Sequence, residues 1–158
     1  MTEPIDKKYV LISAPASERH FEDRLAQAIK KSRDVTVLRV RDISPGSPFI
    51  PEMKLRIQAA DLVVTLLPES AEANPKSFVE LGAARALEKN VVPIAKDKVT
   101  LRGLPSDLNE HAIMYKGNVD KLAAKVLDVL RGTEGQAKHS SVRRARARLG
   151  LTAAERQR

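Results

Sequence analysis

The chain has 158 residues, a net charge of +8 at neutral pH and no cysteine. This length suits one domain with a substantial core, and the missing cysteines exclude disulfides and thiolate metal sites. No apolar run approaches the ~20 residues of a membrane-spanning helix, and the N-terminus has no apolar leader. We therefore expect a cytoplasmic protein without membrane contact, and the three widely separated histidines predict no metal site.

Apolar patterning predicts five strands, which fall in chain order at residues 9–13, 35–40, 62–67, 91–94 and 111–115. Helices are expected between them, because apolar residues recur at intervals of three and four. The expected helical segments are residues 17–29, 50–60, 78–89 and 119–130, with a short irregular helix within 96–110.

Strand and helix alternate along most of the chain. Residues 62–67 and 91–94 are uninterrupted apolar runs, which are typical of strands buried on both faces. We therefore predict an α/β fold with a flavodoxin-like five-stranded parallel sheet. The simplest strand order is 2-1-3-4-5, with right-handed crossovers and helices on both faces.

Glu80 stands just beyond the carboxyl end of the third strand, where open parallel sheets bind ligands. Two starts of the following helix are open. Ser77-x-x-Glu80 fits a capping box, in which Glu80 only accepts a hydrogen bond from the backbone N–H of Ser77. With Asn74 as N-cap and Pro75 as first helical residue, Glu80 lies inside the helix and its carboxylate is free for a ligand.

The loop after the second strand contains Asp42, Pro45 and Gly46. It is either a simple turn or a mobile loop for a ligand or partner at the same sheet edge. The first strand ends in Ser13 and Ala14 without a glycine, and the chain has neither G-x-G-x-x-G nor G-x-x-x-x-G-K-[ST]. Neither standard phosphate-binding loop is therefore present.

The C-terminal stretch, residues 133–158, carries +5 of the net charge, because it holds seven basic and only two acidic residues. Its low apolar content predicts disorder, helix formation on binding, or a linker toward another module. Its arginines suggest weak, sequence-independent contact with nucleic acid. A solvated linker without any partner is the alternative.

Four segments together resemble a TIR (Toll/interleukin-1 receptor) domain of bacterial type. YVLIS resembles its first strand, and RDISPGSPFIPEM resembles its loop after the second strand. IQAADLVVTLLPES and FVELGAARALEKNVVPI resemble its third strand and its glutamate-bearing helix with the next strand. The resemblance covers residues 8–132, which leaves 1–7 as an N-terminal lead and 133–158 as a basic, disordered tail or linker.

The resemblance implies the same flavodoxin-like fold. Many bacterial, plant and axonal TIR domains cleave NAD at the nicotinamide–ribose bond when assembled, whereas others are scaffolds that associate with further TIR domains. Glu80 lies where the essential glutamate of the family lies. The resemblance therefore implies a homo-oligomeric NAD glycohydrolase that releases nicotinamide and ADP-ribose or a cyclic isomer. A tryptophan often found four residues before that glutamate is Lys76 here, and Phe78 is the candidate to replace its packing.

A lone carboxylate suits this chemistry. Nicotinamide in NAD is already a cation and leaves neutral, so the site has to stabilise an oxocarbenium-like ribose. NAD is then a substrate, no cofactor is expected, and Glu80 is the catalytic candidate. The candidate substrate-binding residues are Ser13, Ala14, Arg19, Asp42, Pro45, Gly46 and Ser77.

Two alternative functions stay open. A TIR scaffold would associate with other TIR domains without catalysis and would not need the carboxylate of Glu80. The chain also resembles nucleoside 2-deoxyribosyltransferases, which carry a glutamate in an "ELGxAxAxxK" helix. That second resemblance implies transfer of a deoxyribose between bases.

Overall fold

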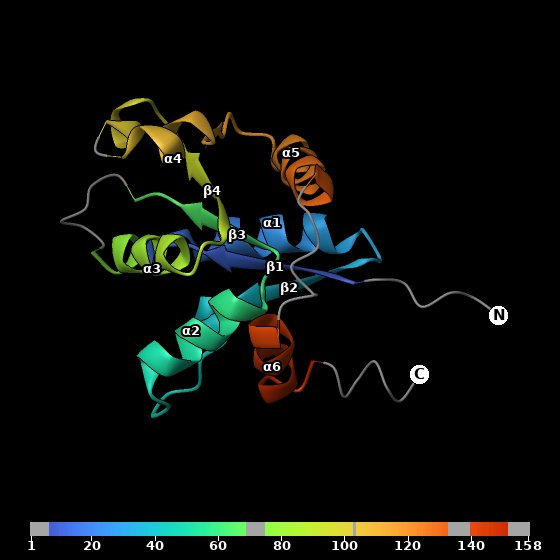
Figure 1. The fold of residues 1–158 in the computed structure, drawn as a ribbon. Coiled ribbons are helices and arrows are strands. Elements are labelled where there is room, and N and C mark those ends of the chain that lie inside the picture. Colours follow the sequence, from blue (N-terminus) through green and yellow to red (C-terminus); the bar gives the residue numbers. More distant parts are fainter. Residues whose placement is uncertain (1–6, 69–74, 103, 133–139, 152–158) are drawn as a thin grey trace.

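The computed structural model describes residues 7–68, 75–102, 104–132 and 140–151. Its sheet has five parallel strands in the order β2-β1-β3-β4-β5, which confirms the predicted topology (Figure 1). The strands are β1 (Lys8–Ser13), β2 (Val35–Arg39), β3 (Leu62–Leu66), β4 (Asn90–Ala95) and β5 (Ile113–Met114).

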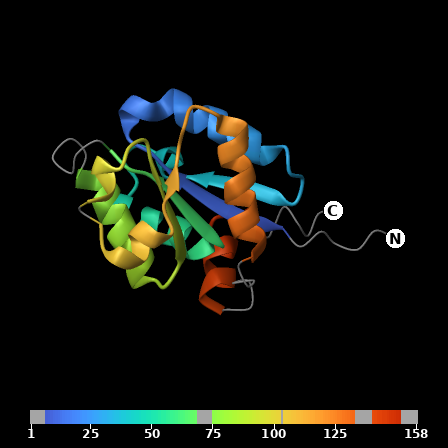
Figure 2. The ribbon, with the colours of Figure 1, turned by 90° about the horizontal axis from the view of Figure 1, so that it is seen from above.

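Helices cover both faces of the sheet. The helices are α1 (Arg19–Lys30), α2 (Phe49–Ala59), α3 (Pro75–Ala86), α4 (Ser106–Glu110), α5 (Val119–Gly132) and α6 (Ser140–Arg148). Short 3₁₀ turns lie at Ala16–Glu18, Val40–Asp42 and Val99–Leu101. Viewed from above, α1 and α5 lie across one face of the sheet (Figure 2). Helices α2, α3 and α4 pack on the other face.

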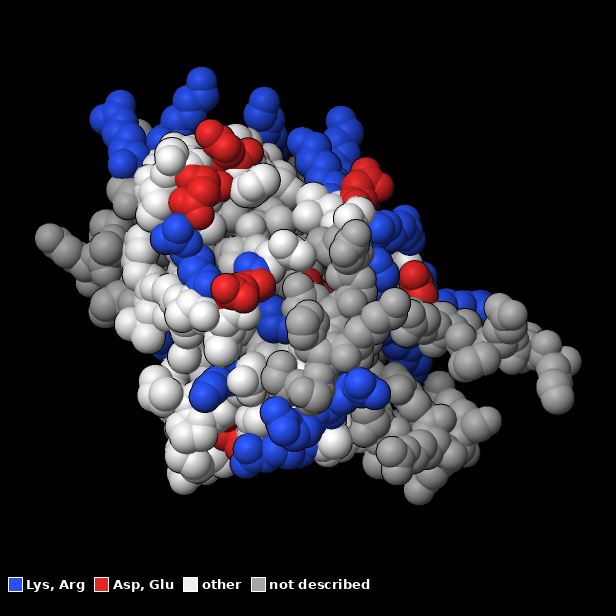
Figure 3. Space-filling view, in the orientation of Figure 1, with Lys and Arg blue, Asp and Glu red and all other residues white. Residues whose placement is uncertain are grey.

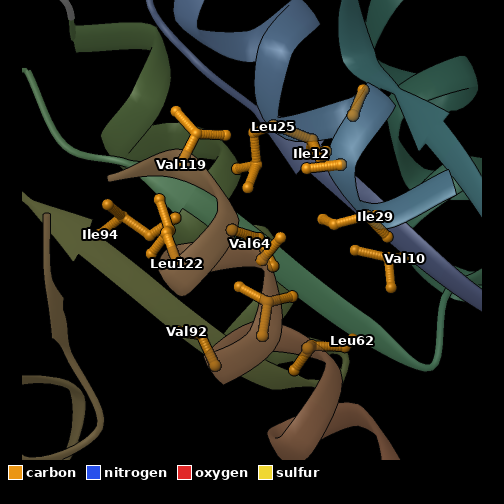
Figure 4. Close-up of a cluster of buried hydrophobic side chains, with 14 of the residues drawn as sticks. Val10, Ile12, Leu25, Ile29, Leu62, Val64, Val92, Ile94, Val119 and Leu122 are labelled. Carbon is orange, nitrogen blue, oxygen red and sulfur yellow. The ribbon is translucent and has the colours of Figure 1, made fainter. Parts of the chain in front are cut away.

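The strands are apolar on both faces because each face has its own core. Val10, Val64 and Val92 meet side chains of α1 and α5 on the first face (Figure 4). Leu11 and Val63, the sequence neighbours of Val10 and Val64, meet α2 and α3 on the second face. This explains why the sequence shows apolar runs without polar alternation.

Helix α6 packs against α2, which differs from the disordered tail or linker expected for this part of residues 133–158. Val142 and Ala145 are buried on its inner face, where Ala145 packs with Leu55 and Ala59 of α2. The arginines obscured this pattern, because one of them, Arg146, belongs to the buried side. The suggested contact with nucleic acid stays a prediction.

Basic side chains are unevenly distributed over the surface. In Figure 3 they project along the upper edge, on the side of α4 and α5, and a second group gathers at the lower part of this face, on the side of α2 and α6. Within the described residues, no helix combines the length and the apolar character that crossing a bilayer requires.

Candidate active site

The candidate site lies at the carboxyl edge of the sheet, where β1 ends and α3 begins. Ser13 is the last residue of β1, and its register partner in β3 is Thr65. Side chains alternate along a strand, so both hydroxyls lie on the α2 and α3 face, two residues after Leu11 and Val63. Thr65 Oγ1 is buried and has no hydrogen-bond partner among the described residues. Unpaired buried polar atoms are uncommon and often mark functional sites.

Helix α3 begins at Pro75, so Ser77 is its third residue and not its N-cap. The capping-box interpretation of Ser77 and Glu80 is therefore wrong, and the later start expected from residue 78 is wrong as well. Asn74, the alternative N-cap, lies outside the described residues. The Ser13 hydroxyl donates a hydrogen bond to Oε2 of Glu80, which places this carboxylate at the sheet edge.

The Glu80 carboxylate is buried, with 4% of the residue exposed. Desolvation by burial raises its pKa, while the hydrogen bond from Ser13 and the charge of Lys76 oppose this change. Lys76 Nζ lies 4.0 Å from Glu80 Oε1 and 4.5 Å from the centre of the Phe49 ring. A cation over an aromatic face is held in place, so Lys76 forms a positively charged rim beside the buried carboxylate.

Glu80 opens into a pocket of about 230 Å³. Residues 13–16, 19, 22, 40, 41, 76 and 80 line it. The structure therefore brings together four of the predicted residues: Ser13, Ala14, Arg19 and Glu80. Typical pockets for drug-sized ligands span roughly 300–1,000 Å³, so this one suits a single base with part of its sugar better than a whole dinucleotide.

The other four predicted residues do not line this pocket. Asp42 ends the 3₁₀ turn that follows β2. Pro45 and Gly46 are the central residues of a β-turn closed by a 3.1 Å hydrogen bond from the backbone N–H of Ser47 to the carbonyl of Ser44. Gly46 has a φ of +85°, as a type II turn requires at that position. Ser77 is buried in α3 away from the pocket lining. Their roles in substrate binding stay predictions.

Sequence reasoning missed Glu22 and Arg41, which line the pocket opposite α3. Glu22 lies on the buried side of α1, and Arg41 Nε approaches its Oε2 to 2.9 Å. The sequence held one signal for Glu22, because it occupies the apolar face of α1, four residues before the buried Ala26. A carboxylate on an apolar helix face needs a cation or a ligand to offset its desolvation.

Glu22 belongs to a four-member charge network with Asp23, Arg39 and Arg41. Arg39 NH1 lies 2.6 Å from Asp23 Oδ1 and 3.9 Å from Glu22 Oε2, and Arg41 NH2 also donates to Asp23. Burial raises the pKa of Glu22, and the two arginines lower it in opposition. The pKa of Asp23 is lowered, mainly by its hydrogen bond from Arg39.

A larger hollow of about 850 Å³ lies at the opposite edge of the sheet, beside the first residues of β3 and β4. The carboxylates that line it, Glu88 and Asp107, are exposed. We place the site at the smaller pocket, because ligands of open parallel sheets bind at the carboxyl ends of the strands. The described residues contain no group of three or more His, Asp or Glu side chains arranged to hold a metal ion.

A family model for the TIR domain matches residues 10–127. The chain therefore belongs to the TIR domain family. A search of curated proteins found no match.

Two solved structures share the fold. A 2-deoxyribosyltransferase from Leishmania mexicana is 21% identical with a TM-score of 0.53, and the match covers 79% of this chain and 98% of that one. The CMP N-glycosidase BcmB of Clostridium botulinum is also 21% identical, with a TM-score of 0.54, over 77% of this chain and 99% of that one. At this identity the likeness shows the flavodoxin-like α/β fold alone.

Proposed function

We propose that the protein is an NAD glycohydrolase with Glu80 as its essential carboxylate. The observation that carries the proposal is the buried Glu80 carboxylate, held at the carboxyl edge of the sheet by Ser13. A buried carboxylate stabilises a positive charge that develops beside it. The ribose C1′ acquires such a charge when its bond to nicotinamide breaks.

The proposed reaction needs no acid to protonate the leaving group. The C1′–N1 bond breaks, its electron pair neutralises the pyridinium nitrogen, and nicotinamide departs as a neutral molecule. The ribose becomes oxocarbenium-like, a water molecule adds to C1′, and its proton goes to solvent. Glu80 acts in its ionised form. Desolvation by burial raises its pKa, and the hydrogen bond from Ser13 and the charge of Lys76 oppose this rise and so favour the ionised form.

The cations around the pocket suit the phosphates of a dinucleotide. Arg19 is exposed at the pocket lining and Lys76 stands at the rim, so both can approach an anionic group outside the buried part. The pocket then holds nicotinamide and its ribose, while the adenosine half extends over the surface. Self-association belongs to this proposal, because a second copy would cover that exposed half.

Two further functions are candidates. A scaffold would use the same surface for association and would not cleave NAD. A nucleoside transferase is favoured by the names of the two structural neighbours, a deoxyribosyltransferase and a CMP N-glycosidase. Both of those names describe chemistry at the bond between a sugar and a base.

The test incubates concentrated protein with NAD and follows nicotinamide by chromatography, with parallel samples of CMP and of a deoxynucleoside plus an acceptor base. The proposal predicts nicotinamide and ADP-ribose, or its cyclic isomer, from NAD. Base exchange on the deoxynucleoside without NAD loss would establish the transferase. No turnover by a protein that light scattering shows to be assembled would favour the scaffold.

A further inference from the structure

The pocket contains a second carboxylate that the proposed reaction leaves unused. Glu22 is only 3% exposed, yet it lines the same pocket as Glu80. It comes from α1, whereas Glu80 comes from α3. With a volume of about 230 Å³, the pocket brings both carboxylates within reach of one small ligand.

The contacts of Glu22 are one-sided. Its Oε2 faces Arg41 Nε at 2.9 Å and Arg39 NH1 at 3.9 Å. Among the described residues, the ion-pair contacts of Glu22 with both arginines run through Oε2. Because Glu22 also lines the pocket, Oε1 is its candidate acceptor for a ligand there.

Arg41 adds donors beside this acceptor. Its Nε faces Glu22 and its NH2 donates to Asp23, while no described residue pairs with NH1. A guanidinium carries five N–H donors, so several stay available. An acceptor beside a donor matches a carboxamide, whose NH₂ donates and whose carbonyl accepts. A carboxylate in the same place would be repelled by Glu22, which offsets its attraction to Arg41 and removes the hydrogen bond that the NH₂ group donates.

We propose that Glu22 and Arg41 recognise the carboxamide edge of the leaving base and so select an amide over the corresponding acid. This rests on the proposed function for the identity of the base, nicotinamide. Glu22 is then a specificity-determining residue, and Glu80 stays the group beside the sugar. Ser13 orients the carboxylate of Glu80, and Arg41 orients that of Glu22, so the two carboxylates have separate roles.

If Glu22 has only a structural role, its substitution should not change the preference for the amide. In that case it only neutralises Arg39 and Arg41, as Asp23 does. Asp23 is the matched control, because it contacts the same two arginines but does not line the pocket. Glu22→Gln and Asp23→Asn each remove one negative charge from the same network.

The experiment measures binding without turnover. Nicotinamide and nicotinic acid are titrated separately into ¹⁵N-labelled full-length protein, and the amide spectra also report whether each variant is folded. The wild type should prefer nicotinamide by at least ~10-fold, the scale of one hydrogen bond to a charged group together with avoided repulsion. Glu22→Gln should reduce this preference about tenfold, chiefly by admitting the acid, and Asp23→Asn should keep it.

Three results would overturn the inference: no measurable nicotinamide binding by the wild type, no preference for the amide, or an equal preference in both variants. Failure of the proposed function looks different. Selective nicotinamide binding by a protein that never cleaves NAD would leave the recognition by Glu22 and Arg41 intact and remove only the glycohydrolase.

Discussion

The hydroxyl of Ser13 donates a hydrogen bond to Oε2 of Glu80, across a separation of 67 residues in the sequence. This bond joins the end of β1 to α3 and fixes the direction in which the carboxylate points. Glu80 Oε1 is left near Lys76 at the rim of the pocket. The orientation of the proposed catalytic group therefore depends on the sheet, and not on the cap of its own helix.

Ser13→Ala should shift the pH dependence of NAD cleavage. The hydrogen bond from Ser13 lowers the pKa of Glu80, so its loss raises that pKa and moves the acidic limb of kcat/KM to higher pH. We expect about a tenfold loss near neutral pH, the scale of one hydrogen bond to a charged group. Ser17→Ala changes an exposed serine in the adjacent turn and is the control. An unchanged acidic limb in Ser13→Ala would contradict the assigned role.

Glu80→Gln should not destabilise the protein at pH 8 and is expected to stabilise it. Burial raises the pKa of Glu80 above its ordinary value of 4.5. The stability that this group contributes is fully present below pH 4.5 and is lost as pH rises through the raised pKa. The neutral amide avoids that loss, so the melting-temperature advantage of the variant should shrink toward pH 4.5. A variant that melts lower than the wild type at pH 8 would show that the ionised carboxylate stabilises the fold.

Arg146→Met should weaken the docking of α6. Arg146 donates to the carbonyl of Ala59 at 2.9 Å and to Asp61 Oδ2 at 3.0 Å, and it lies over the ring of Tyr9 at 4.2 Å. The substitution removes the ion-pair partner of the buried Asp61, and breaking a buried ion pair typically costs about 3–5 kcal/mol. Urea denaturation measures this loss, and the exposed Arg148→Met is the control. Equal stability of the two variants would mean that α6 does not depend on this ion pair.

Glu88→Gly should stabilise the protein. Glu88 follows α3 with a φ of +57°. Its backbone N–H donates to the carbonyl of Arg85, and the N–H of Lys89 donates to the carbonyl of Ala84, as in a Schellman motif. This left-handed conformation costs a residue with a side chain about 1–2 kcal/mol of stability, and glycine adopts it without that cost. We expect a gain of about 1 kcal/mol by urea denaturation, with no gain in Glu88→Ala. A loss of stability in Glu88→Gly would show that the side chain of Glu88 outweighs the strain.

The sheet could be predicted from sequence because its signals are local. Each buried strand is an apolar run. Connections between parallel strands are right-handed, which leaves few possible strand orders. The turn at Pro45 and Gly46 could also be predicted, because glycine readily adopts the positive φ that this turn requires at its second central position. The position of Glu80 followed from these elements, since a helix after β3 must begin at the carboxyl edge.

The remainder depends on residues far apart in the chain. Whether Ser77 or Asn74 begins α3 could not be decided from spacing, because both fit known caps. The arginines of α6 looked uniformly solvated, and only the buried Asp61, 85 residues earlier, distinguishes Arg146. Glu22 and Arg41 meet at the pocket because the 3₁₀ turn after β2 lies beside α1. Such pairings arise from tertiary packing, which no local pattern encodes.

The most direct test of the account compares nicotinamide release by the wild type, Glu80→Gln and the exposed control Glu110→Gln, all at the same high protein concentration. Loss of the Glu80 charge removes the stabilisation of the oxocarbenium-like ribose, so the rate should fall by roughly two orders of magnitude or more. Glu110→Gln should match the wild type, and no variant should lose thermal stability. Cleavage of NAD by Glu80→Gln at the wild-type rate would contradict the central claim.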